Sequence, residues 1–249
     1  MRRLFFSIFL LTGLVPAVVA QSSNAVMNIP SSNTMNPGSM DASTFGLNQY
    51  LTTMKPNGLA GVSGSPYVDN RWLPARMAFT NNLPLEPVQL KYDALAGRIL
   101  MRPANGIGDS LQLNDVMLAQ FELQEPATSK SPARKRTFRR FLEAATPSQQ
   151  REYVEVLHQG QFTLLKRYTK VIRAGSRTGL GETNDQILSH EEYYMVLPNA
   201  APVPVKLSVK SLSAADPAIA GSLKADASAQ KAKTDADWVA VLATVDPKN

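Results

Sequence analysis

The sequence offers few residues that carry covalent or acid–base chemistry. It contains no cysteine and only two histidines, His158 and His190. A thiol nucleophile, a disulfide and a cysteine zinc cluster are therefore excluded. His158 lies at a predicted hairpin turn and His190 at the end of a predicted loop, so we expect two solvated imidazoles rather than a paired site.

Short catalytic and metal-binding motifs are also missing. There is no nucleotide-binding, zinc-protease or serine-hydrolase motif, and the run at 61–64, Gly-Val-Ser-Gly, lacks the final glycine of a nucleophile elbow. Residues 41–46 match a calcium loop poorly, because Ser43 and Phe45 stand where oxygen-rich ligands are needed. We therefore predict no catalytic, cofactor-binding or metal-binding residue.

Carboxylate pairs need separate treatment, because glycoside hydrolysis requires only two acids held across a sugar. Glu152 and Glu155 fall on opposite faces of one predicted strand, while Glu191 and Glu192 are adjacent. No spacing singles out an acid and its partner, so we expect the protein not to be an enzyme. A cell-wall or polysaccharide hydrolase is one alternative.

Basic residues are concentrated in the middle of the chain. Lys and Arg number 26 against 20 Asp and Glu, a net charge of +6, but residues 130–177 alone hold 12 basic and 3 acidic residues. If neighbouring strands present these cations on one surface, they form a patch for an anionic polymer or lipid head groups. A solvated face balanced by the acidic remainder is the alternative interpretation. The candidate anion-binding residues are Arg134, Lys135, Arg136, Arg139, Arg140, Lys166, Arg167, Lys170 and Arg173.

The start of the chain has the features of a secretory signal peptide. Two arginines at 2–3 precede an apolar run over 4–15, and small residues at 18–20 suit cleavage before Gln21. The run is shorter than the ~20 residues that span a bilayer. We expect an exported chain, periplasmic or secreted, with no transmembrane segment after cleavage. We expect it not to be a lipoprotein, because no cysteine follows the predicted cleavage point.

Composition divides the chain into three parts. Residues 1–20 form the signal peptide, and residues 21–63, rich in Ser, Asn, Met, Gly and Pro, are expected to be a flexible polar spacer. Residues 64–249 are expected to fold as a single β-rich domain whose last part, about 211–246, is helical. Without cysteine, this domain depends on packing for its stability.

Alternating apolar residues on either side of turn residues predict three hairpins. They join 88–92 to 98–102, 153–157 to 162–172, and 192–197 to 203–209. Residues 174–189, with three glycines, are expected to form a mobile loop. Consecutive hairpins favour an antiparallel sheet or small barrel. We therefore predict an α+β fold, mainly antiparallel β, with C-terminal helices.

Capping residues predict where the C-terminal helices begin. Asp216 followed by Pro217 suits a helix start, and Thr234 with Asp237 is a weaker relative of the capping box. Four apolar residues after Thr234 recur at helical spacing and should face the sheet as core rather than bind a ligand. They are Trp238, Val241, Leu242 and Val245.

A set of aromatic and hairpin positions resembles a group of uncharacterised exported proteins of Gram-negative bacteria. The segments are SPYVDNRW at 65–72, LKYD at 90–93, the hairpin at 153–172, YYMVL at 193–197, KSL at 210–212 and DADWVAVL at 235–242. The resemblance implies an envelope location and a β-rich domain with a helical end, and it supplies no site residue. We expect non-enzymatic binding or assembly in the cell envelope, with other envelope proteins or an anionic polymer as partners, and no nucleic acid.

Overall fold

The computed structural model describes residues 51–53, 59, 61–81, 87–103, 110–129, 132–175 and 184–246. All of them belong to the second of the chain's two units, Ser39–Asn249. The predicted signal peptide and most of the predicted spacer lie outside the described residues.

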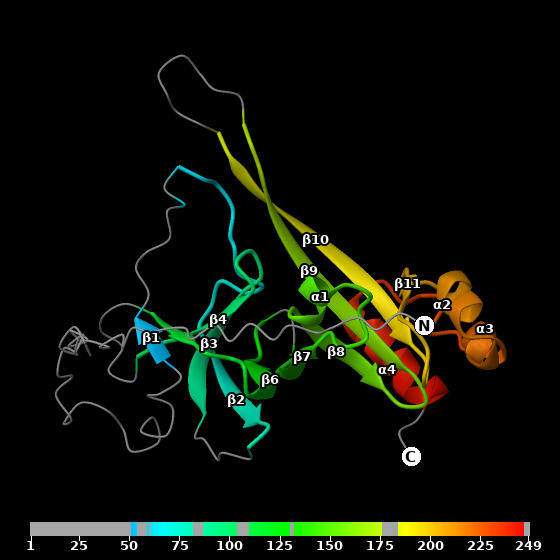
Figure 1. Ribbon diagram of the computed structural model, residues 1–249. Coiled ribbons are helices and arrows are strands. Elements are labelled where there is room, and N and C mark those ends of the chain that lie inside the picture. The colour runs from blue at the N-terminus through cyan, green and yellow to red at the C-terminus, as the bar shows by residue number, and fades with distance from the viewer. Residues whose placement is uncertain are drawn as a thin grey trace, which may run out of the picture. The chain divides into compact units, whose positions relative to one another are not determined.

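Within the described residues, eleven strands form one antiparallel sheet in the order β1-β5-β4-β3-β2-β6-β7-β8-β9-β10-β11 (Figure 1). The strands are β1 Leu51–Thr53, β2 Leu73–Phe79, β3 Val88–Asp93, β4 Arg98–Met101, β5 Leu111–Leu113, β6 Leu118–Glu125, β7 Arg134–Arg140, β8 Tyr153–Gln159, β9 Thr163–Arg173, β10 Gln186–Val196 and β11 Val203–Val205. The helical elements are α1 Pro147–Gln150, α2 Val209–Ala215, η3 Pro217–Ile219, α3 Ala220–Ala225 and α4 Asp235–Val245. The predicted fold class is confirmed.

The three predicted hairpins are present as β3–β4, β8–β9 and β10–β11. In the first, the buried carboxylate of Asp93 accepts hydrogen bonds from the N–H groups of Leu95 and Ala96 at 3.1 and 3.0 Å, and Gly97 supplies the positive φ of 64°. In the third, Asn199 takes a φ of 57° in the turn. Gly and Asn tolerate a positive φ that most side chains disfavour. The local sequence could therefore identify these hairpins.

The sheet curls around an aromatic core. Phe121 and Phe138 stack with their ring centroids 4.9 Å apart, and Tyr92 and Tyr153 contact them edge-on. The backbone N–H of Tyr153 donates to the Tyr92 hydroxyl at 3.2 Å. Three strands separate β3 from β8 in the sheet order. The contact between residues of these two strands therefore requires strong curvature of the sheet.

A second core lies between the helices and strands β8 to β11. Trp238, Val241 and Leu242 of α4 are buried there and Val245 packs against them, so the predicted apolar stripe is confirmed. The capping box is complete, because Thr234 Oγ1 accepts from the Asp237 N–H while the Asp237 carboxylate accepts from the Thr234 N–H. We call the sheet face that bears Phe138, Glu155 and Lys166 the helix face, since α4 packs on this side of β9.

Two predicted boundaries were wrong. Strand β10 begins at Gln186 instead of after residue 189, because Ile187 and Leu188 pair with Ile172 and Val171 across the hairpin. Residues 176–183 of the predicted loop lie outside the described residues. Part of the predicted spacer also belongs to the sheet: β1 pairs with β5, and Leu51 packs against the aromatic core.

Candidate functional site

The nine candidate cations do not lie on one surface. Register aligns Phe138 of β7 with Glu155 of β8 and Lys166 of β9, and side chains alternate between faces along each strand. The helix face therefore receives Arg134, Arg136, Arg140, Lys166 and Lys170. The opposite face receives Lys135, Arg139, Arg167 and Arg173. This division does not support a continuous cationic patch.

Seven of the nine cations also form ion pairs with carboxylates. The closest distances are Arg134–Glu125 2.5 Å, Lys135–Glu122 3.4 Å, Arg136–Glu155 2.8 Å, Arg139–Glu143 2.7 Å, Arg140–Asp115 3.0 Å, Lys166–Asp235 2.6 Å and Arg167–Glu152 2.6 Å. Their charge is thus largely compensated within the protein itself. The excess of basic residues over this stretch of sequence is matched by acidic residues from before and after it.

The most buried of these seven ion pairs lies on the helix face. The guanidinium of Arg136 donates to both carboxylate oxygens of Glu155, at 3.0 and 2.8 Å, and both side chains are about 5% exposed or less. Tyr168 accepts from Arg136 at 2.9 Å and donates to Glu155. Burial, together with the Glu155 charge, raises the pKa of Tyr168, so the phenol stays neutral. Burial alone would lower the pKa of Arg136, but hydrogen bonds to Glu155 raise it overall.

Lys166 connects the sheet to α4. Its ammonium lies 2.6 Å from Asp235 and 2.8 Å from Glu191, and Asp235 also accepts from the Tyr193 hydroxyl at 2.8 Å. Burial and the hydrogen bond to Asp235 raise the pKa of Tyr193. This cluster has acids and bases, but each is held by another, which is the arrangement of a structural network.

The two exceptions, Lys170 and Arg173, lie at the far end of β9. Within the described residues neither contacts a carboxylate within ion-pair distance: Lys170 donates to Ser189 Oγ at 2.6 Å and Arg173 to Gln186 Oε1 at 2.7 Å. Burial lowers the pKa of Lys170, and the nearby charge of Glu191 only partly opposes this. Of the nine predicted cations, these two are the ones without an ion pair to a carboxylate of the described residues.

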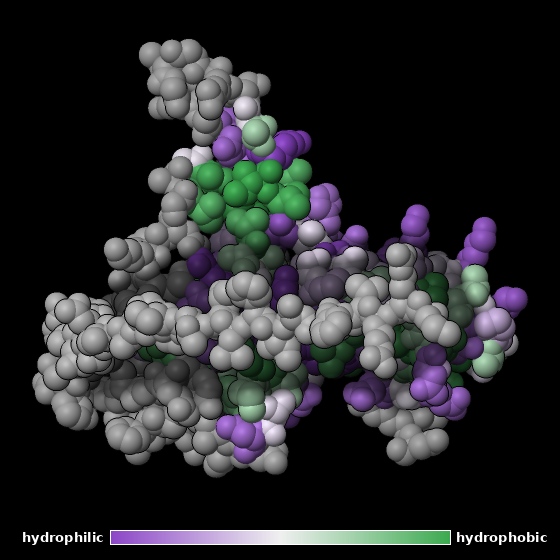
Figure 2. Space-filling view, in the orientation of Figure 1, coloured by the Kyte–Doolittle hydropathy of each residue, from purple (hydrophilic) through white to green (hydrophobic). Residues whose placement is uncertain are grey.

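Strands β9 and β10 extend beyond their neighbours as a two-stranded arm (Figure 1). We define the distal arm as residues 168–173 and 186–191. Pairing with β8 ends at Arg167, whereas pairing with β10 continues to Arg173. Val171 and Ile172 are 42% and 47% exposed, and Figure 2 shows a hydrophobic patch over this part of the molecule. The distal arm thus combines exposed β-branched residues with two cations that form no ion pair with a carboxylate of the described residues.

The histidines are not a pair, and one of them is not solvated. His190 lies exposed in the middle of β10, opposite Thr169, and not at the end of a loop. His158 is 6% exposed, and its Nε2 lies 2.8 Å from Asp246 Oδ2. Asp246 also accepts from the Gln161 N–H at 3.0 Å. The expectation of a solvated His158 was wrong because Asp246, 88 residues away, covers the hairpin turn.

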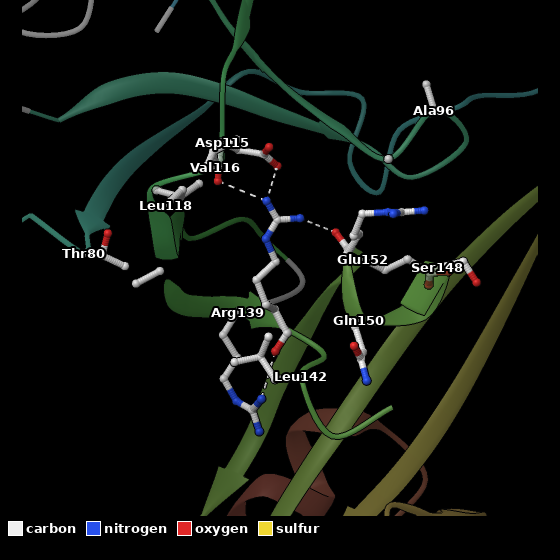
Figure 3. Close-up of a pocket in the computed structure, with 14 residues that line it drawn as sticks. Thr80, Ala96, Asp115, Val116, Leu118, Arg139, Leu142, Ser148, Gln150 and Glu152 are labelled. Carbon is white, nitrogen blue, oxygen red and sulfur yellow. Dashed lines mark hydrogen bonds and ion pairs between the residues drawn. The ribbon is translucent and has the colours of Figure 1, made fainter. Parts of the chain in front are cut away.

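A pocket of about 750 Å³ opens between the β3–β4 turn, β6, the end of β7 and α1 (Figure 3). Arg140 lines the pocket and contacts both the carbonyl oxygen and the carboxylate of Asp115, each at 3.0 Å. Glu152, the other acid lining it, is bound by Arg167 at 2.6 and 2.9 Å. Val116 and Leu142 are exposed in its lining, at 78% and 68%. Both of its carboxylates thus form ion pairs with arginines.

The remaining acids of the sequence analysis are bound in the same way. Glu155 is held by Arg136, Glu191 lies 2.8 Å from Lys166, and Glu192 lies 2.6 Å from Arg167. Sequence reasoning missed Asp235, which binds Lys166, Asp246, which contacts His158, and Tyr168, which donates to Glu155. No local signal identifies Asp235 and Asp246, since their contacts span 69 and 88 residues.

The described residues contain neither a cluster suited to a metal ion nor a membrane-spanning helix. In these segments, no three His, Asp or Glu side chains are grouped as a metal site would require. Nor does any helix in the described part of the chain have the length and apolar character needed to cross a membrane. No protein-family model, curated protein or solved structure matches this chain.

Proposed function

We propose that this chain is an exported, non-enzymatic binding or assembly protein of the cell envelope, and that it contacts its partner through the distal arm. The observation that carries the proposal is the exposure of Val171 and Ile172 beside Lys170 and Arg173, which lack carboxylate partners among the described residues. Apolar and cationic side chains at the end of a projecting hairpin are suited to contact a macromolecule.

Binding of an anionic polymer by the whole basic stretch has less support. Seven of its nine cations already contact carboxylates, and the nine are divided between two faces. An added phosphate or carboxylate would have to displace these internal partners. A hydrolase has less support as well, because the pocket's acids are bound by arginines.

A pull-down from envelope extract tests the proposal. The bait is the chain from Gln21 onward, compared with Val171→Ser/Ile172→Ser and with a control, Val116→Ser/Leu142→Ser, that removes exposed apolar side chains from the pocket. We expect a partner that is retained at about 0.5 M salt, where an exposed ionic contact is screened. The arm variant should lose it and the control should keep it.

Equal retention by both variants, or loss of all binding at high salt, would contradict the proposal. Export is tested separately, by sequencing the N-terminus of the protein recovered from the envelope fraction. We expect it to begin at Gln21, and an unprocessed chain in the cytoplasm would contradict the envelope role.

A further inference from the structure

One edge of the distal arm has open backbone hydrogen-bonding groups. The Ile187 N–H donates to the Ser63 carbonyl at 2.8 Å on the outer side of β10, so the backbone groups of Ile187 point away from β9. Its register partner Ile172 therefore directs its own N–H and C=O away from β10, and so does Lys170 two residues earlier. β8 pairs no further than Arg167, so these groups meet no strand among the described residues.

The other edge of the arm is already covered by this chain. Ser63 forms a bridge to Gln186, and its N–H donates to the Asp185 carbonyl at 2.9 Å. Gly64 has a φ of +97°, and a Cβ there would lie 2.9 Å from the Ile187 carbonyl oxygen. The segment at 63–64 thus shows how an extended chain adds to this arm, and among the described residues the β9 edge is the one without a neighbouring strand.

The arm itself shows which side chains suit a neighbour of β9. Across the hairpin, the polar residues Gln186 and Ser189 lie opposite Arg173 and Lys170. The apolar residues Ile187 and Leu188 lie opposite Ile172 and Val171. A strand on the open edge meets the same four residues of β9 from the other side. Because Lys170 and Arg173 lack carboxylate partners among the described residues, its two polar positions are best filled by Asp or Glu.

We propose that an extended acidic segment of a partner protein, with the pattern acidic–apolar–apolar–acidic, adds as a strand to the open edge of β9 at residues 170–173. This inference rests on the proposed function, and it names the partner's chemistry and its mode of binding. Main-chain hydrogen bonds to Lys170 and Ile172 provide affinity, and carboxylates beside Lys170 and Arg173 provide selection.

Two other occupants fit the arm less well. In a lipid bilayer the backbone groups of Lys170 and Ile172 would lose their water without gaining a partner, which is unfavourable for each group. A second copy that pairs β9 with β9 would bring the Lys170 and Arg173 cations of both copies together. An acidic strand avoids both penalties.

The test uses a fluorescent hexapeptide, Thr-Glu-Val-Val-Glu-Thr, whose symmetric pattern suits either strand direction. Binding to the chain from Gln21 onward is measured by anisotropy, with Thr-Lys-Val-Val-Lys-Thr as the control probe. We expect Lys170→Gln/Arg173→Gln to weaken binding at least tenfold. The matched variant Lys206→Gln/Lys210→Gln, which removes two exposed lysines elsewhere, should stay within twofold of the wild type.

Ile172→Pro tests the backbone contribution. It deletes an N–H that points to the open edge and is not used between β9 and β10, so the hairpin keeps its own hydrogen bonds. We expect at least a tenfold loss of binding with an unchanged melting temperature. If this variant unfolds, an N-methylated probe is tested on the wild-type protein instead. N-methylation removes backbone N–H groups from the peptide and so tests the same main-chain hydrogen bonds.

Equal binding of the acidic and basic probes, or full binding by Ile172→Pro and by the N-methylated probe, would overturn strand addition. Binding to phosphatidylglycerol vesicles that is retained by Ile172→Pro would also overturn it, because this result assigns the arm to a membrane. Concentration-dependent dimers that Ile172→Pro abolishes would overturn it as well, because they assign the arm to a second copy. If strand addition alone is wrong, retention from envelope extract still depends on Val171 and Ile172. If that dependence is missing, the proposed function fails as well.

Discussion

The two halves of β9 differ in how the same types of residue are used. In the proximal half, Lys166 and Arg167 contact carboxylates, and Leu164 and Leu165 are fully buried. In the distal half, Lys170 and Arg173 contact only neutral oxygens among the described residues, and Val171 and Ile172 are largely exposed. One strand therefore runs from an interior of ion-paired cations to an exposed surface whose two cations pair with no carboxylate of the described residues.

The comparison shows that local charge density is a poor guide to available charge. A cation inside a sheet must be compensated, because leaving it buried without a partner costs several kcal/mol. A cation on a projecting hairpin has water as its partner and can exchange it for a ligand. The distal half of β9 is thus the part of the basic stretch that is best suited to bind a partner.

The largest effect is expected from breaking the buried pair of the helix face. Arg136→Met leaves the Glu155 carboxylate buried without its cation and should destabilise the fold by about 3–5 kcal/mol. Urea unfolding measures this. The double variant Arg136→Met/Glu155→Leu should recover most of the loss, and a single variant within about 1 kcal/mol of wild type would show that the pair is not buried as described.

A matched pair of truncations on one face of β9 compares the halves directly. Leu165→Ala removes a fully buried side chain that packs near Phe141, and should cost about 2–5 kcal/mol. Val171→Ala lies on the same face but on the arm, and should change stability by about 0.5 kcal/mol or less. Similar losses for the two variants in urea unfolding would remove the distinction between the halves.

The contact that closes the β8–β9 turn should make stability depend on pH. Burial would raise the pKa of Asp246, but hydrogen bonds from His158 and from the N–H groups of Gln161 and Phe162 lower it overall. The folded pKa lies below the unfolded value, so this stabilisation is present above about pH 4 and is lost as pH falls through the folded value. Asp246→Asn should cost about 1–3 kcal/mol at pH 7.

Urea unfolding of wild type and Asp246→Asn at several pH values checks this expectation. The difference in free energy of unfolding should shrink towards zero at acid pH. A difference that stays constant from pH 7 to well below pH 4 would show that the carboxylate charge is not the stabilising feature. Gly160→Ala is a second probe, since a Cβ there would lie 2.5 Å from Asp246 Oδ2.

The smallest effect is expected from removing single arginines of β9. Arg167→Gln breaks partly exposed pairs to Glu152 and Glu192 and should cost about 0.5–1 kcal/mol. Arg173→Gln removes a cation without a carboxylate partner among the described residues and should leave the melting temperature almost unchanged. A larger loss for Arg173→Gln would mean that the arm is part of the stable fold rather than a free surface.

Much of the fold was predictable because its signals are local. The hairpin turns at Gly97 and Asn199, the capping box at Thr234 and the apolar stripe of α4 depend on residues only a few positions apart. Strand β2 was missed although Leu73, Ala75, Met77 and Phe79 alternate perfectly with exposed or half-buried neighbours. Its signal was present in the sequence. β6 was harder to find, because a bulge interrupts its register with β2.

The candidate site was predicted as a set of residue types and not as an arrangement. Counting charges identified Arg134, Lys166 and the other cations as unusual, but it could not show which of them contact acids. Strand register divided the set between two faces. The partners of Lys166 and His158, Asp235 and Asp246, lie 69 and 88 residues further along the sequence. Contacts over such separations leave no periodic pattern to read.

By itself, the sequence determined the antiparallel β class, three hairpins, the helix caps and the absence of disulfide support, since these follow from composition and from neighbours along the chain. Tertiary structure alone decided which cations are neutralised and that β9 pairs with no described strand on its β8 side beyond Arg167. The physical reason is that burial, ion pairing and edge exposure depend on which strands lie side by side, and that is fixed only when the whole sheet has formed.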